Sequence, residues 1–153
     1  MAAQKFLSHL DNAPALGYLL WRSARKWQQH VNGAVAPLQL TSTQATILLA
    51  CERLTKPQKL VTPMDIVKHT GIGKVTASQA IRTLVAKGFL TVNSSTDKRA
   101  KTLQLTKEGG RRARHAADAI AQAHTDFFSE IPAATRDELS AILARFIVKG
   151  AEE

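Results

Sequence analysis

The sequence of 153 residues predicts a mainly α-helical chain with one small β hairpin, an α+β fold class. Two kinds of periodicity carry this prediction. Over most of the chain, apolar residues return every three or four positions, as in helices with one buried face. In residues 89–92 and 102–105, apolar and polar residues alternate, which is the pattern of half-buried strands. The polar stretch between these two segments would form the turn of the hairpin.

The N-terminal part of the chain predicts one long helix over residues 11–36. Asp11 or Asn12 would cap it. Tyr18 and Trp21 add apolar surface outside its main stripe. Because a helix that is apolar on more than one side has more than one packing partner, we expect contacts with its own domain and with a second copy of the chain. The main stripe consists of Leu16, Leu20, Ala24, Trp27, Val31 and Val35.

A second helix is predicted from Thr41 to about Arg53. Pro37 interrupts the helix before it, and Thr41 with Gln44 makes the pattern of a capping box. Residues 54–61 contain a proline and two lysines, and we expect a loop there that leads into a short strand.

The next two helices predict a helix-turn-helix. The first is short, Pro63–His69, with a proline and an acid in its first turn. The second covers residues 74–87 and ends at Gly88, which suits the left-handed conformation that follows many helix C-termini. Residues 70–73 join them and include two glycines. Two short helices around a glycine-containing turn are typical of this motif.

The second of these helices, which we call the recognition helix, carries the candidate DNA contacts. Its inner stripe is apolar, at positions 77, 80, 81, 84 and 85. Its outer face has no acid and offers hydroxyls, an amide and cations, which bond base edges and phosphates. We expect Arg82 to meet a guanine or a phosphate, Gln79 an adenine, and the Ala77 methyl a thymine. The candidates are Lys74, Thr76, Ala77, Ser78, Gln79 and Arg82.

A hairpin with a polar, cationic tip at residues 93–101 follows the recognition helix directly. A helix-turn-helix followed by such a hairpin is a winged helix-turn-helix domain, and we place this DNA-binding lobe at residues 38–105. Residues 11–36 and 107–150 would flank it as dimerisation helices.

Two helices are predicted after the hairpin. Thr106 would cap the first, which runs to Phe128, and residues 129–132 separate it from a last helix over residues 133–149. The N-terminal and C-terminal helices together offer more apolar surface than a small lobe can cover. We therefore expect a twofold homodimer, which would present two recognition helices to successive major grooves about 34 Å apart.

The net charge of +9 is concentrated in one part of the sequence. Residues 68–114 hold 11 Lys or Arg against two acids, whereas the rest of the chain holds 10 of each sign. A general solubility surface would spread the charge more evenly. A concentrated excess of cations is typical of a protein that binds a polyanion such as DNA.

Several other classes of protein are not indicated. One cysteine excludes an intrachain disulfide, and no apolar run has transmembrane length, so we expect a cytoplasmic protein without membrane contact. No His or Cys cluster has metal-ligand spacing, and no nucleophile or nucleotide-binding motif is present. We therefore predict no enzyme activity, no metal and no cofactor.

Three motifs resemble a known family. They are Lys87-Gly88-Phe89-Leu90, then Asp97-Lys98-Arg99, then Leu103-Gln104-Leu105-Thr106-Lys107-Glu108-Gly109; upstream, Leu40-Thr41 with Gln44 and Leu48 also fits. Together they resemble the signature of the MarR family of bacterial transcriptional regulators, over nearly the whole chain as a single MarR-like domain. The resemblance implies a homodimer that binds a pseudo-palindromic duplex and represses transcription until a small molecule releases it.

The resemblance also implies roles for particular residues. Arg99 would enter the minor groove, with Asp97 orienting it through an ion pair; a narrow minor groove concentrates negative potential and attracts Arg. Lys98 and Lys101 would contact phosphates. A crevice between the dimerisation helices and the DNA-binding lobe would hold a small aromatic acid, lined by Tyr18, Trp21 and Arg22. The alternative is that these residues are only core or dimer contacts.

Alternatives remain open at this level. Ser42, with Thr41, stands at a helix N-terminus and would either meet a phosphate or serve only as a cap. Cys51 would be a buried, inert thiol or the sensor of a thiol-based oxidant-sensing repressor. The whole chain would be a sequence-specific regulator, a nonspecific architectural DNA binder, or a winged helix that binds another protein.

Overall fold

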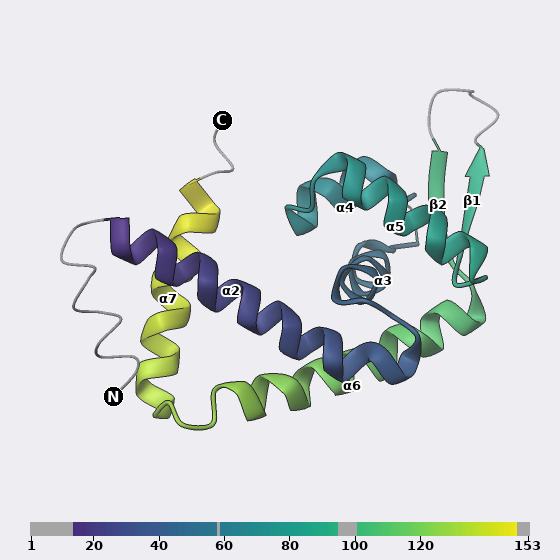
Figure 1. Cartoon of the computed structure of the whole chain (residues 1–153). Helices are drawn as coiled ribbons and strands as arrows, with labels where there is room; N and C mark the ends of the chain where they lie inside the picture. The colour runs from purple at the N-terminus through teal and green to yellow at the C-terminus, as the bar shows by residue number, and fades with distance from the viewer. Residues whose placement is uncertain (1–13, 58, 95–100, 150–153) are drawn as a thin grey trace.

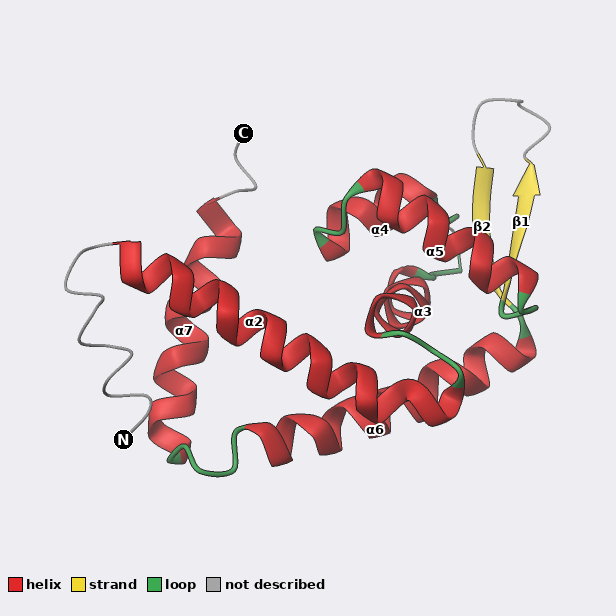
Figure 2. Ribbon diagram, viewed as in Figure 1, coloured by secondary structure: helices red, strands yellow, loops and turns green. Residues whose placement is uncertain are grey.

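The computed structural model describes residues 14–57, 59–94 and 101–149. This part of the chain is mainly helical with one two-stranded antiparallel sheet (Figure 2), which confirms the predicted fold class. The elements are α2 (Pro14–Val35), η1 (Ala36–Leu38), α3 (Ser42–Leu54), α4 (Pro63–Thr70), α5 (Lys74–Ala86), β1 (Leu90–Ser94), β2 (Lys101–Leu105), α6 (Lys107–Phe127) and α7 (Ala133–Lys149). The expected caps Asp11 and Asn12 lie outside the described residues.

The molecule has a lobe and an arm. Elements α3, α4, α5 and the hairpin form the lobe. The helices α2 and α6 pack against one another and extend away from the lobe, and with α7 they form the arm (Figure 1). The hairpin lies at one end of α6, and α7 follows the other end. This arrangement is a winged helix-turn-helix flanked by N-terminal and C-terminal helices.

No single described helix is long and apolar enough to cross a membrane, although the bent pair Leu16–Leu38 and Ser42–Leu54 has the length and composition.

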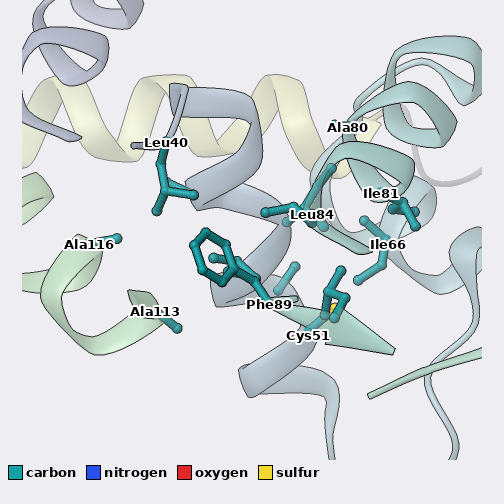
Figure 3. Close-up of a cluster of buried hydrophobic side chains, with 14 of the residues drawn as sticks. Leu40, Cys51, Ile66, Ala80, Ile81, Leu84, Phe89, Ala113 and Ala116 are labelled. Atoms are coloured by element: carbon teal, nitrogen blue, oxygen red, sulfur yellow. The ribbon is translucent and has the colours of Figure 1, made fainter. Parts of the chain in front are cut away.

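The core of the lobe lies where α3 meets the helix-turn-helix and the hairpin (Figure 3). Its fully buried side chains include Ile47, Leu48, Ile66, Leu84 and Leu90. The predicted inner stripe of α5 is confirmed by the burial of its alanines, Ile81 and Leu84. Val85 was expected in the same stripe and is not buried, because it stands at the edge of the contact with 36% of its surface exposed.

Side-chain caps fix where three helices begin. Thr41 and Gln44 form the predicted capping box of α3, and Thr62 with Asp65 forms another at α4. The bonds from Thr62 hold the pKa of Asp65 below its ordinary value. Gly73 caps α5 without a side-chain bond, and Gly88 follows α5 with the predicted positive φ of 72°.

The hairpin pairs Leu90 with Leu105 and Ser94 with Lys101. Val61 forms a further bridge to Leu103, so the loop before α4 reaches the sheet, as the expected short strand would. The third capped helix, α6, starts directly after the hairpin: Gly109 N–H donates to Thr106 Oγ1 at 2.9 Å. Thr106 Oγ1 also donates to Gly88 O, so the cap residue holds the first turn of α6 against the end of the recognition helix.

Gly109→Ala is expected to destabilise the fold. A Cβ at residue 109 would stand 1.9 Å from the backbone oxygen of Phe89, which cannot move without disturbing the start of the hairpin. Overpacking of this kind costs about 2 kcal/mol or more. Urea unfolding measures the loss. Gly110→Ala is the matched control, because the nearest atom to its Cβ is the Arg114 Nη1 at 3.8 Å; equal stability of the two variants would contradict the close approach.

Candidate nucleic-acid interface

The outer face of α5 is open to solvent. Its inner residues are packed on α3 and α4, and this contact turns the polar face of the recognition helix away from the core. The candidates on this face are all exposed: Lys74, Thr76, Ser78, Gln79 and Arg82. The face therefore offers cations, hydroxyls and an amide, side chains that can bond base edges and phosphates.

The expectation for Ala77 is wrong. Its side chain is fully buried, because it lies on the inner stripe of α5, so its methyl cannot reach a thymine. Val75 is the residue that sequence reasoning missed: it is 71% exposed, in the first turn of α5. An exposed large apolar side chain amid polar neighbours suits the C5 methyl of thymine. The signal was present in the sequence, since Val75 falls outside the apolar stripe.

A groove of about 320 Å³ joins α4, α5 and the hairpin on one surface, and we call it the α5 groove. Its walls include Met64 from α4 and Val92 from β1. Its cations come from two elements, Lys74 and Arg82 on α5 and Lys101 on β2. The fold thus brings Arg82 of the recognition helix and Lys101 of β2 to the same groove, although β1 and the hairpin turn lie between them in the sequence.

Most of the predicted wing tip lies outside the described residues. Asp97, Lys98 and Arg99 belong to that stretch, so the expectations for them remain predictions. Lys101 is described, is exposed, and pairs with Ser94 at the outer end of the hairpin. Lys101 therefore places a cation of the hairpin at the edge of the α5 groove.

The phosphate contact expected of Ser42 is corrected by the structure. Ser42 is only 7% exposed, and its backbone N–H donates to Asn32 Oδ1 at 2.6 Å. A buried hydroxyl and an occupied N–H leave little to offer a phosphate. Thr41 acts as the cap of α3, accepting a bond from the N–H of Gln44 at 3.2 Å.

The cationic excess is divided between two places. Arg111 and Arg112 both form ion pairs with Glu108, and Lys87 donates to Gln39 O at 2.6 Å. Since α6 starts at the base of the hairpin, its cations stand at the end opposite the wing tip. The sequence therefore overstates how many cations face one ligand, because part of the charge holds the fold together.

A second cavity, of about 420 Å³, lies between the arm and the lobe, and we call it the α2 cavity. Trp21, Arg25, Trp27 and Gln28 line it from α2, and hydroxyls of α3 face them. Trp21 was predicted there. Tyr18 and Arg22, also predicted, are not among its described lining; Arg25 takes that place and lies over the Trp21 ring at 5.7 Å. The lining on the lobe side consists of Ser42, Thr43, Thr46, Thr70 and Ile72.

Sequence comparison decides which family this architecture represents. The HTH-type transcriptional regulator YdcH of Bacillus subtilis, itself uncharacterized, is 30% identical over 114 residues, which are 74% of this chain and 78% of YdcH. The family model described as "MarR family" matches residues 38–100. The chain belongs to the MarR family. It is therefore a MarR-family transcriptional regulator, as the three sequence motifs predict.

Solved MarR-family structures share the fold. The Bordetella bronchiseptica protein BpsR, whose DNA binding is regulated by 6-hydroxynicotinic acid, has a TM-score of 0.77 and 23% identity, covering 86% of this chain and 98% of its own. A mutant of Escherichia coli MarR, complexed with operator DNA, has a TM-score of 0.76 and 21% identity, covering 86% and 93%. At these identities the likeness concerns the fold alone.

Cys51 is buried in the core of the lobe, with 1% of its surface exposed. Burial raises the pKa of its thiol from 9.0 to about 12. Because the thiolate is the species that reacts with oxidants, this environment suppresses reactivity at neutral pH. The position favours the inert thiol over the oxidant sensor.

Among the residues that the structure describes, no group of three His, Cys, Asp or Glu side chains is placed to hold a metal ion.

Proposed function

We propose that this MarR-family regulator is a homodimeric repressor that binds a pseudo-palindromic DNA duplex in the bacterial cytoplasm and is released by a small aromatic acid. One observation carries the DNA-binding part. The exposed polar face of α5 and Lys101 of the hairpin border the same groove, so a duplex that receives α5 in its major groove also meets the wing.

The parts of this surface would act differently on DNA. Arg82 and Gln79 stand on the exposed face of α5, where side chains of their length can pair with base edges. Val75 adds an apolar contact for a thymine methyl. Lys101 is a flexible point charge at the outer end of β2 and suits a phosphate. Specificity would therefore come from α5, and much of the affinity from the cations.

The wing residues outside the described part of the chain extend this proposal. By family resemblance, Arg99 enters the adjacent minor groove, Asp97 orients it and Lys98 contacts a phosphate. Lys101 supports this assignment, since it stands at the edge of the α5 groove two residues after Arg99. Repression would follow by occupation of promoter DNA.

Dimerisation is supported by the apolar surface of the arm. Leu16 is 72% exposed and Trp21 55% exposed on α2, while Phe146 and Ile147 are 62% and 78% exposed on α7. Exposed large apolar side chains on both flanking helices are typical of surfaces that another chain covers. A second copy that covers both helices with its own α2 and α7 would form a self-complementary twofold interface.

The DNA-binding surface predicts different effects for Arg82→Ala and Lys101→Ala. Bound sequences are first selected from a randomised duplex library, and affinities are then measured from low to physiological salt. Arg82→Ala should lose about 1–3 kcal/mol on the selected duplex and relax its specificity. Lys101→Ala should weaken all duplexes alike and lower the salt slope by about one unit.

Lys26→Ala is the control of equal charge change, since Lys26 is exposed on α2, in the arm. It should bind the selected duplex as the unmodified chain does. Salt-sensitive binding without any selected motif would replace this proposal with the nonspecific architectural DNA binder. Absence of binding at low salt would leave the winged helix that binds another protein.

The effector is proposed to bind in the α2 cavity. Arg25 supplies a cation for a carboxylate, Trp21 and Trp27 supply aromatic faces, and the hydroxyls of Thr43 and Thr46 on α3 supply hydrogen bonds. The cavity is bordered by both the arm and the lobe, so a ligand that fits one arrangement of the two better than another would shift their equilibrium. If the distance between the two recognition helices no longer matched that between successive major grooves, the dimer would dissociate from its operator DNA.

Intrinsic fluorescence can test this site, because the chain has two tryptophans and both line the α2 cavity. Aromatic monocarboxylates, with 6-hydroxynicotinic acid among them, are screened for quenching. A compound that quenches should also weaken duplex binding, and Arg25→Ala should lower its affinity about tenfold or more. Arg22→Ala is the matched control outside the lining. An equal loss in both variants would contradict the site.

A further inference from the structure

The corner between α2 and α3 is held in an unfavourable backbone conformation. Gln39, which follows η1, has a φ of 59°, and it is the one non-glycine residue with positive φ in the described part of the chain. Left-handed backbone is disfavoured for a residue with a Cβ. It persists where surrounding contacts over-determine it. The contacts at this corner should therefore show what holds Gln39 in this conformation.

Two cations from distant elements bond this corner. Lys87, the C-cap residue that follows α5, donates from Nζ to Gln39 O at 2.6 Å, and Arg112 of α6 donates from Nη1 to Leu38 O at 2.9 Å. Successive backbone oxygens of the corner are thus each bonded by a positive charge. Charge-assisted bonds of this kind are stronger than neutral ones.

Each cation also binds a second group. Lys87 Nζ donates to Gln44 Oε1 at 3.2 Å, and Gln44 belongs to the capping box of α3. Arg112 donates from Nε to Glu108 at 2.8 Å, and its guanidinium lies over the Phe89 ring at 5.3 Å. Phe89 is the second residue after Lys87 in sequence. Both cations therefore tie the corner to the segment 87–89, where the recognition helix ends.

We propose that Lys87 and Arg112 are positioning residues that lock the corner at residues 36–39 to the C-terminal end of α5, so that the direction of α2 sets the direction of the recognition helix. The corner is the covalent link between α2, which lines the α2 cavity, and the lobe. A change in the angle of α2 moves the oxygens of Leu38 and Gln39, and the two cations carry that movement to segment 87–89. The DNA consequence of this inference rests on the proposed function.

The first test does not involve DNA. Hydrogen exchange is followed by mass spectrometry in peptides that cover residues 36–44 and 84–92. Lys87→Met should speed exchange in both segments about tenfold, since one cation bonds both. Lys87→Arg, which keeps a charged donor, should restore most of the protection. Lys107→Met, another exposed lysine at a helix end, should leave both segments unchanged.

The second test separates positioning from phosphate contact. On the library-selected duplex, Lys87→Met should lose about tenfold in affinity with an unchanged salt slope, while binding to unrelated duplex stays the same. Arg112→Met should act in the same direction, although α6 lies at the base of the hairpin. Lys87→Gln, a second neutral variant, is measured beside Lys87→Met and decides the result if that variant unfolds.

Three outcomes would overturn the inference. A salt slope lowered by about one unit for all duplexes would make Lys87 a phosphate contact. Unchanged exchange in residues 36–44 would show that the two bonds do not hold the corner. Changed exchange with unchanged affinity for a selected duplex would show that the corner does not position α5. If the unmodified chain selects no duplex at all, the proposed function fails, and the exchange result still decides whether the lock exists.

Discussion

The architecture depends on the close approach of α6 to the end of the recognition helix. Gly109 lies so near Phe89 O that no side chain fits between them. Thr106 Oγ1 donates to Gly88 O at 2.7 Å, and Thr106 N–H donates to Phe89 O at 3.1 Å. The cap residue Thr106 and the glycine Gly109 thus fix the chain at the junction of α5, the hairpin and α6.

This junction decides where the functional surfaces lie. It directs the hairpin away from the start of α6, so that Lys101 reaches the α5 groove while the cations of α6 remain at the base. It also places Arg112 where it can stack on Phe89 and bond the corner before α3. The α5 groove, the α2 cavity and the arm are therefore arranged around one set of short backbone contacts.

The sequence predicted what local periodicity and capping control. The described helices, the caps at Thr41 and Thr106, and the hairpin follow from local residue patterns, and these predictions are confirmed. The MarR-family assignment is confirmed as well, by the family model and by the relative YdcH.

Errors arose where packing between distant segments decides the outcome. Ala77 and Val75 are two residues apart, and only the docking of α5 shows which one is exposed. Arg25 rather than Arg22 lines the cavity because the rotation of α2 depends on its packing against α3 and α6. Lys87 and Arg112 bond backbone oxygens 48 and 74 residues away, a relation that periodicity cannot reveal.

In the proposed function, the two recognition helices of one dimer bind successive major grooves. Hydroxyl-radical footprinting of the library-selected duplex tests it most directly. We expect two protected segments on one face of the DNA, related by twofold symmetry and centred about one helical turn, or 34 Å, apart. A single protected segment, or uniform protection without phase along the duplex, would contradict it.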